Sequence, residues 1–130
     1  MDTEQRPDIE YYPAGILKGL PFSEAVRVGK MLYLAGQIGL DETGTLVPGG
    51  IAAETRQTME NIRTTLERHG SSLDQIIKVT VMLADMAEWA EMNKVYVSYF
   101  DKHLPARSSF GTTGLALGAR VEIECTAILA

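Results

Sequence analysis

The sequence predicts an α+β fold in which two helices pack on one face of a mixed β-sheet. A length of 130 residues corresponds to a single domain, residues 1–130. Two segments repeat apolar residues at intervals of three and four, which is the period of an amphipathic helix. The segments around them are short and rich in β-branched and aliphatic residues, as strands are. The expected order is a β-hairpin, a helix, a strand, a second helix and two final strands.

The composition excludes several classes of function. The formal net charge is −5, and the 12 Lys and Arg residues form no run. Nucleic-acid binders and proteins that bind anionic membrane surfaces carry basic patches, so neither partner is expected. No apolar run is long enough to span a bilayer, and the acidic, polar start of the chain does not resemble a targeting peptide.

Cysteine and histidine are too sparse for a disulfide or a zinc site. Cys125 is the only cysteine, and we interpret it as a small buried hydrophobic residue. The two histidines and the thiol lie far apart in sequence, so no metal-ligand spacing exists. We therefore expect no metal and a reducing, cytoplasmic compartment.

The first half of the chain predicts an arm, a hairpin and a helix. Residues 1–20 are interpreted as an N-terminal arm followed by loops, and segments 25–29 and 31–36 as strands joined by the hairpin signal Gly29-Lys30. Turn-forming residues fill 41–50. The turn-forming residues of the arm and loops at 1–20 are Pro7, Pro13, Gly15 and Gly19. One face of the helix that follows is formed by Ile51, Thr55, Met59, Ile62 and Leu66.

The second half begins where this helix stops. Gly70 supplies the stop, and His69 is interpreted as a helix-end residue rather than a catalytic one. After a turn at 71–74, the apolar run 76–84 predicts a strand covered on both faces. Asp85, with Glu88 three residues later, predicts the N-terminus of a second helix. Its apolar stripe, interpreted as core, consists of Trp89, Met92, Tyr96 and Tyr99.

The final segments predict a short strand or loop at 108–114 and a strand from Val121. In the latter, Val121, Ile123 and Cys125 alternate with Glu122, Glu124 and Thr126. Two helices can cover only one face of the sheet. The other face would carry Thr80, Met82, Thr126 and Ile128, or the residues opposite to them. Such a face is too apolar for water, which predicts an oligomer.

Neither a hydrolase triad nor a nucleotide-binding glycine motif fits the sequence. A Ser-His-Asp hydrolase could be built from residues close together in the chain, but there is no G-x-S-x-G elbow. The candidate residues are Asp101, His103, Ser108 and Ser109. The glycines at 111, 114 and 118 match neither a dinucleotide-binding nor a Walker spacing.

Arg107, in the segment HLPARSSFG, is the remaining candidate. Pro105 restricts the backbone before it, and the forked, permanently charged guanidinium suits bidentate binding of a small carboxylate. Glu122, expected on an adjoining strand, could orient a water molecule. From spacing alone, a surface arginine and two exposed strand glutamates remain the simpler interpretation.

Six pieces of the sequence together resemble the reactive intermediate/imine deaminase A family (RidA, YjgF-like), whose older label is L-PSP endoribonuclease. They occur in the family's order between Phe22 and Ala130, and the pairing of TRQ-x-x-ENI with P-A-R-S and V-E-I-E is specific. The pieces are AVRVG, LAGQIGLDETG, ETRQTMENIRTTLERHGSSLDQIIKVTVMLADM, EMNKVYVSYF, LPARSS and VEIECTAIL.

The resemblance implies a chorismate-mutase-like fold assembled as a homotrimer, with sites in clefts between subunits. It also implies hydrolysis of 2-imino acids, tautomers of enamines released by pyridoxal-phosphate enzymes, to 2-keto acids and ammonia. No metal or organic cofactor would take part.

The resemblance also implies roles for individual residues. Arg107 would bind the substrate carboxylate and Glu122 would position water. Gly36 would supply a backbone contact, Asn93 would form part of the cleft wall, and Ser109 stands where many members have cysteine.

Two departures from the family's pattern concern substrate choice. Phe22 stands where members commonly carry tyrosine; its ring could still line the pocket without the phenolic hydrogen bond. Gly39 stands where proline is usual. These changes leave open a trimer that binds or senses small carboxylates without turnover. A ribonuclease is a third hypothesis, which the older family label suggests and the negative net charge opposes.

Overall fold

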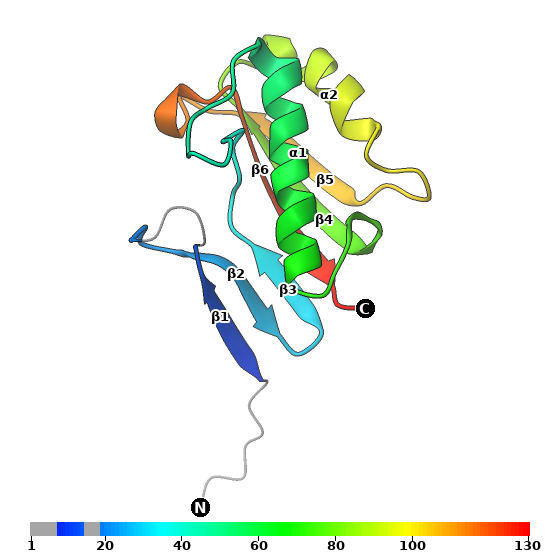
Figure 1. The fold of residues 1–130 in the computed structure, drawn as a ribbon. Coiled ribbons are helices and arrows are strands. Elements are labelled where there is room, and N and C mark those ends of the chain that lie inside the picture. Colours follow the sequence, from blue (N-terminus) through cyan, green and yellow to red (C-terminus); the bar gives the residue numbers. More distant parts are fainter. Residues whose placement is uncertain (1–7, 15–18) are drawn as a thin grey trace, which may run out of the picture.

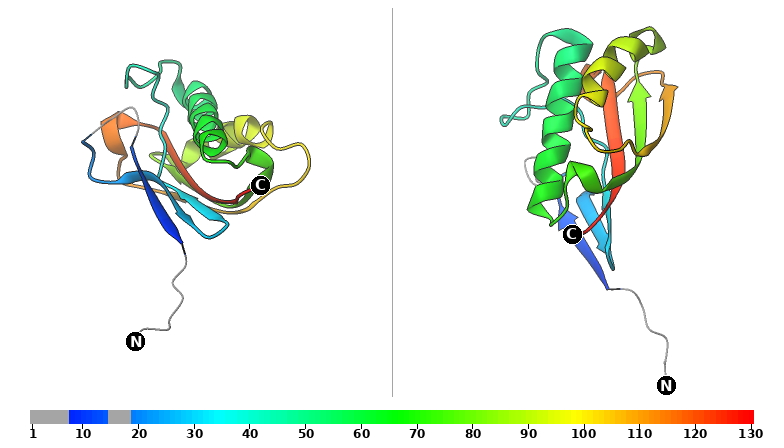
Figure 2. Two further views of the ribbon diagram at one scale, coloured as in Figure 1. Left: turned by 60° about the horizontal axis from the view of Figure 1, so that its bottom comes forward. Right: turned by 90° about the vertical axis from the view of Figure 1, so that its right-hand side faces the viewer.

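The computed structural model describes residues 8–14 and 19–130, and within them the chain forms a six-stranded sheet and two α-helices. The strands are β1 (Ile9–Pro13), β2 (Ser23–Val28), β3 (Met31–Leu34), β4 (Ile76–Leu83), β5 (Ala106–Gly111) and β6 (Val121–Ile128). The helices are α1 (Gly50–Arg68) and α2 (Trp89–Val97), with short 3₁₀ turns at Leu73–Gln75, Met86–Glu88 and Ala116–Gly118. Both helices lie on the same side of the sheet (Figures 1 and 2), which confirms the predicted α+β class.

The strand order across the sheet is β1-β2-β3-β6-β4-β5 (Figure 1). β4 and β5 are parallel and the other neighbouring pairs are antiparallel, so the sheet is mixed as expected. β4 lies between β5 and β6. The expectation that Glu122 lies on a strand adjoining that of Arg107 is therefore wrong.

The hairpin and the first helix follow the sequence closely. Gly29 adopts a φ of 58°, the left-handed conformation that glycine tolerates, and turns β2 into β3. The helical periodicity is confirmed, because all five residues of the predicted face of α1 are buried. These are Ile51, Thr55, Met59, Ile62 and Leu66.

β1 was not expected, because residues 1–20 were interpreted as an arm and loops. Ile9 to Pro13 instead pair antiparallel with β2 at the edge of the sheet. The strand is short and mostly exposed, so it lacks the apolar alternation that marks a half-buried strand. Of the turn-forming residues in that segment, Pro7 and Gly15 lie outside the described residues.

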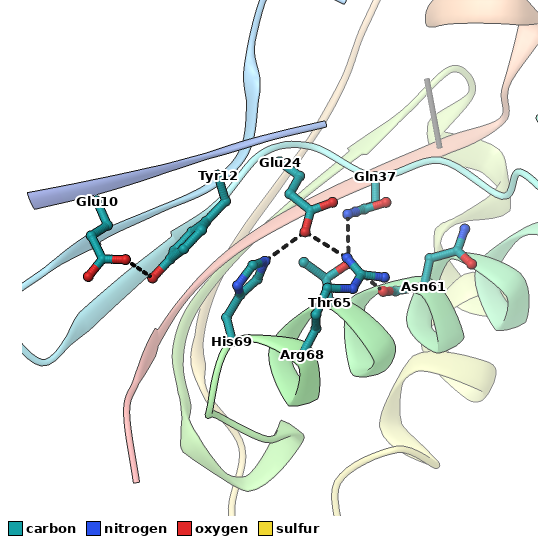
Figure 3. A network of polar contacts seen from close by, with 8 residues as sticks. All are labelled: Glu10, Tyr12, Glu24, Gln37, Asn61, Thr65, Arg68 and His69. Atoms are coloured by element: carbon teal, nitrogen blue, oxygen red, sulfur yellow. Dashed lines mark hydrogen bonds and ion pairs between the residues drawn. The ribbon is translucent and has the colours of Figure 1, made fainter. Parts of the chain in front are cut away.

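His69 ends α1, as expected, and takes part in a polar network with β2 (Figure 3). Glu24 has no residue opposite it in β1, because the register shifts there. Its carboxylate accepts hydrogen bonds from Arg68 and His69, each at 2.6 Å, and the His69 ring stacks on Tyr12 at 4.1 Å between centroids. This network joins the end of α1 to the β1–β2 pair.

The start of the second helix is built differently from a full capping box. The Asp85 carboxylate accepts a hydrogen bond from the backbone N–H of Ala87, as an N-cap does. The Glu88 carboxylate, however, accepts a hydrogen bond from Arg120 at 2.8 Å instead of binding the cap backbone. In the described part of the chain, no helix is long and apolar enough to cross a membrane.

The strand register defines two faces of the sheet. Val79, Val81, Ile123 and Cys125 are buried beneath the helices, while Thr80, Met82 and Thr126 are partly exposed and Ile128 is 39% exposed on the opposite face. The four residues expected on the uncovered face therefore do lie there. The same face also carries the exposed rings of Tyr33 and Phe110.

Candidate active site

Arg107 lies on the face of β5 that the helices cover, paired with the buried Val79 of β4. Its guanidinium carbon is 4.8 Å from the ring centroid of Tyr96 and 5.9 Å from that of Trp89, both on α2. Within the described residues, no carboxylate lies within ion-pairing distance of it. No described carboxylate therefore neutralises the charge of this guanidinium, which leaves that charge available to an anion.

A cavity of about 490 Å³ opens between α2 and the start of β5, beside this guanidinium. Its lining combines apolar side chains with an amide and two cations, and it includes no acidic residue. The lining residues are Trp89, Asn93, Lys94, Tyr96, Val97, Leu104, Pro105 and Arg107. An apolar cleft with a few convergent polar groups is the usual form of a small-molecule site.

Buried polar atoms near this cavity lack protein partners. Asn93 Oδ1, the Tyr96 hydroxyl and Ser109 Oγ are buried and make no hydrogen bond with any described residue. Ser109 follows Arg107 by two residues, so it lies on the same face of β5. Because buried polar groups are normally paired, such atoms beside a cavity suggest a ligand or a neighbouring molecule.

Burial and neighbouring charge define the state of Tyr96. Burial raises the pKa of this phenol to about 12, against a smaller lowering effect of the Arg107 charge. The ring therefore stays neutral near pH 7 and places no second anion beside Arg107.

Glu122 lies on the other face of the sheet, paired with Met82. A Cβ atom at Gly36 would overlap the Glu122 carboxylate, so glycine is required there for this close approach. Burial raises the pKa of the Glu122 carboxyl, and the negative charge of Glu124 raises it further. No cation of the described residues forms an ion pair with Glu122.

The segment that carries Gly36 is held from two sides. Gln37 and Ile123 exchange backbone hydrogen bonds of 2.8 and 2.9 Å, beside Glu122. Asn61 of α1 donates to the carbonyls of Ile38 and Leu40 at 3.2 and 2.9 Å. Figure 3 shows Gln37, which donates to Thr65, and Asn61 on this side of α1.

Gly39 packs closely against α1. A Cβ atom at Gly39 would lie 2.9 Å from the carbonyl oxygen of Glu54 and 3.1 Å from its Cα. The glycine thus allows the segment to pack tightly against α1.

The structure brings the expected site residues together in two groups. Arg107 and Asn93 line the cavity on the helix-covered side, and Ser109 lies on the same face of β5 as Arg107. Gly36 and Glu122 lie together on the other face. Phe22 stands just before β2 with its ring 49% exposed. The expected site residues therefore do not form one cleft within a single chain.

Sequence reasoning placed Trp89 and Tyr96 in the core and so missed their contact with Arg107. Tyr96 is buried, but Trp89 is 42% exposed. The signal was available: Trp89, Asn93 and Tyr96 are spaced i, i+4 and i+7 on α2, which places them on one helix face.

Known proteins resemble this chain over most of its length. Residues 16–129 match the family model described as endoribonuclease L-PSP. The 2-iminobutanoate/2-iminopropanoate deaminase of Mus musculus is 41% identical over 109 residues, which are 83% of this chain and 81% of that protein. The chain belongs to the RidA/YjgF/L-PSP family.

Other relatives extend the similarity to most of the fold. The deaminase of the same name from Homo sapiens is 39% identical over 109 residues, 83% of this chain and 80% of that protein. The crystal structure of RidA from an Antarctic Psychrobacter species has a TM-score of 0.82 at 33% identity and covers 97% of this chain and 100% of that one. The yeast protein YEO7 has a TM-score of 0.84 at 37% identity, covering 97% and 98% of the two chains.

Proposed function

We propose that this protein hydrolyses reactive 2-imino acids, such as the imine tautomers of 2-aminoacrylate-type enamines, to 2-keto acids and ammonia. The observation that carries the proposal is a guanidinium, Arg107, that has no acidic partner and stands in a cavity without acidic lining. Relatives at about 40% identity are named 2-iminobutanoate/2-iminopropanoate deaminases, which supports the same reaction.

The proposed reaction is the addition of water to an imine, followed by loss of ammonia. A water molecule adds to the imine carbon, the C=N π electrons move to nitrogen, which takes up a proton, and a carbinolamine forms. The carbinolamine hydroxyl then loses its proton, nitrogen takes up a proton, the C–N bond breaks as the C=O bond forms, and ammonia leaves. Holding the imine and the water in reacting geometry supplies the acceleration.

Each candidate residue has a distinct part in this scheme. Arg107 holds the substrate carboxylate through two parallel N–H···O bonds. Glu122, whose pKa is raised by burial, holds the water and takes its proton. The backbone at Gly36 would steady the imine, and the side chains of Asn93 and Ser109 would line the site.

We further propose that the site is completed when copies of the chain associate as a homotrimer. The separation of Arg107 and Glu122 on opposite faces supports this, since one copy could supply the cavity with Arg107 and another the Glu122–Gly36 face. The exposed apolar residues of the uncovered sheet face support it as well. Light scattering at micromolar concentration tests the assembly, and a monomer that still hydrolyses imines would contradict it.

The deciding experiment generates 2-aminoacrylate with a serine dehydratase and measures the rate of keto acid release with and without the protein. Acceleration by the wild type, and none by Arg107→Ala, is expected. A wild-type protein that leaves the rate unchanged would remove the proposed activity.

A small-carboxylate-binding or sensing trimer is the second candidate, and Phe22 favours it, because phenylalanine lacks the hydroxyl that tyrosine would bring. Binding of 2-ketobutanoate without imine turnover would support it. A ribonuclease is opposed by the net charge of −5. RNA degradation by purified wild-type protein that Arg107→Ala abolishes would support it instead. A single buried thiol is compatible with action in the cytoplasm.

A further inference from the structure

Arg107 differs from the arginines that serve the fold. Arg27, Arg63, Arg68 and Arg120 each bind at least one carboxylate at 3.0 Å or less. Arg107 faces two aromatic rings on α2 instead, at 4.8 and 5.9 Å from its guanidinium carbon. Both distances fall within the range of cation–π attraction.

We propose that Trp89 and Tyr96 are positioning residues that hold the Arg107 guanidinium by their ring faces and leave its N–H donors free for the substrate carboxylate. This inference rests on the proposed function, because it assigns how the carboxylate-binding group of that site is oriented.

A ring and a carboxylate can both orient an arginine, but they differ in how far they occupy the N–H donors that a ligand needs. A carboxylate would occupy the N–H donors and neutralise the charge, so an incoming substrate would have to displace it. A ring face attracts the guanidinium through its quadrupole without accepting those hydrogen bonds.

The local structure suits this aromatic clamp, which is formed by Trp89 and Tyr96. Trp89 and Tyr96 stand two turns apart on one short helix, so α2 fixes both rings relative to β5. Met92 and Val95, between them in sequence, are buried and anchor that helix to the core. Asn93 lies between the two rings on the same helix face and lines the same cavity.

The first test uses fluorescence, because Trp89 is the chain's one tryptophan. Titration with 2-ketobutanoate should change the emission of the wild type in a saturable way and leave that of Arg107→Ala unchanged. A wild-type emission that does not respond, although calorimetry detects binding, would contradict contact between Trp89 and the occupied guanidinium.

The second test removes the rings one at a time. Trp89→Leu and Tyr96→Leu should each weaken 2-ketobutanoate binding and raise KM by about five- to thirtyfold, the range expected for loss of a cation–π contact. Because neither ring is proposed to touch the reacting water, kcat should fall much less than KM rises. Trp89→Phe and Tyr96→Phe, which keep a ring, should restore most of the binding.

Tyr99→Leu is the matched control. Tyr99 also stands beside a guanidinium, that of Arg63 at 5.3 Å, but it does not line the cavity. Its replacement should leave KM and ligand affinity unchanged. If Tyr96→Leu fails to fold, Trp89→Leu decides alone, since that side chain is 42% exposed.

The outcomes separate the two proposals. A wild type that neither binds 2-ketobutanoate nor hydrolyses imines would refute the proposed function. A wild type that does both, with leucine variants that bind as tightly as it does, would refute the clamp alone.

Discussion

Arg27 and Arg107 show how the same side chain serves two regions of the molecule differently. Arg27, on β2, donates to the carboxylates of Asp8 and Glu10 at 3.0 and 2.7 Å, and it joins β1 to the rest of the sheet. These carboxylates also raise the pKa of the Arg27 guanidinium. The guanidinium of Arg107, on β5, instead lies over the rings of Trp89 and Tyr96. Arg56 is exposed and also forms no ion pair with a described residue, so Arg107 is distinguished by two features together: it lacks a carboxylate partner and it lines the cavity.

Two glutamates repeat the same contrast. Glu24 binds Arg68 and His69, and the group connects α1 to β2 (Figure 3). Glu122 has no ion-pair partner in the described part of the chain, and its pKa is raised. A carboxylate with a raised pKa accepts a proton more readily, which suits a group that takes a proton from water.

Replacing the two arginines should produce the largest difference. Arg107→Ala should lower kcat/KM by a factor of about a hundred or more, because an anionic substrate loses its charged partner. Arg107→Lys should lose most of the activity, since an ammonium cannot form two parallel hydrogen bonds to a carboxylate. Steady-state rates with enzymatically generated 2-imino acids measure both.

Arg27→Ala is the control for these variants. It should leave kcat/KM near that of the wild type, with circular dichroism and molecular mass unchanged in all three proteins. Equal losses in Arg27→Ala and Arg107→Ala would show that the contrast between paired and unpaired arginines has no functional meaning.

Glu122→Gln should have the next largest effect. It removes the proposed base but keeps the shape of the side chain, so kcat should fall by about a hundredfold. Binding of 2-ketobutanoate should persist because Arg107 is intact, and calorimetry measures it. A full rate in this variant would remove Glu122 from the mechanism.

The pH dependence should reveal the environment of Glu122. Burial, with the charge of Glu124, raises the pKa of this carboxyl. The base form is lost as pH falls through that raised value, so activity should decline on acidification at a pH above the ordinary glutamate range.

Glu124→Gln removes the neighbouring charge and should move this acidic decline to lower pH. The profile of kcat/KM, corrected for spontaneous imine hydrolysis at each pH, measures the shift. A profile identical to that of the wild type would mean that another group controls the acid side.

The smallest effect is expected at the thiol. Cys125 is buried at 5% exposure, and burial raises its pKa to about 12, so no reactive thiolate is present near pH 7. Cys125→Ala should lower the free energy of unfolding by about 1 kcal/mol, as a small cavity does, and leave kcat/KM unchanged. Urea denaturation measures the first quantity; loss of activity on alkylation of the folded protein would contradict the second.

Local patterns predicted most elements because each depends on residues close together in sequence. The buried face of α1, the Gly29 turn and the alternation of β6 all follow from periodicity or from backbone freedom at one residue. β1 was missed because an exposed edge strand carries little periodic signal, and its pairing with β2 comes from residues ten or more positions away.

The sequence by itself determined the α+β class, the buried face of α1, the resemblance to the RidA family and the candidates Arg107 and Glu122. Only the tertiary structure decided that β4 separates the strands of these two residues and that their side chains lie on opposite faces. It also decided that Arg107 meets Trp89 and Tyr96. The physical reason is that alternation along a strand gives relative faces within that strand alone, whereas strand order and register depend on how distant segments pack together.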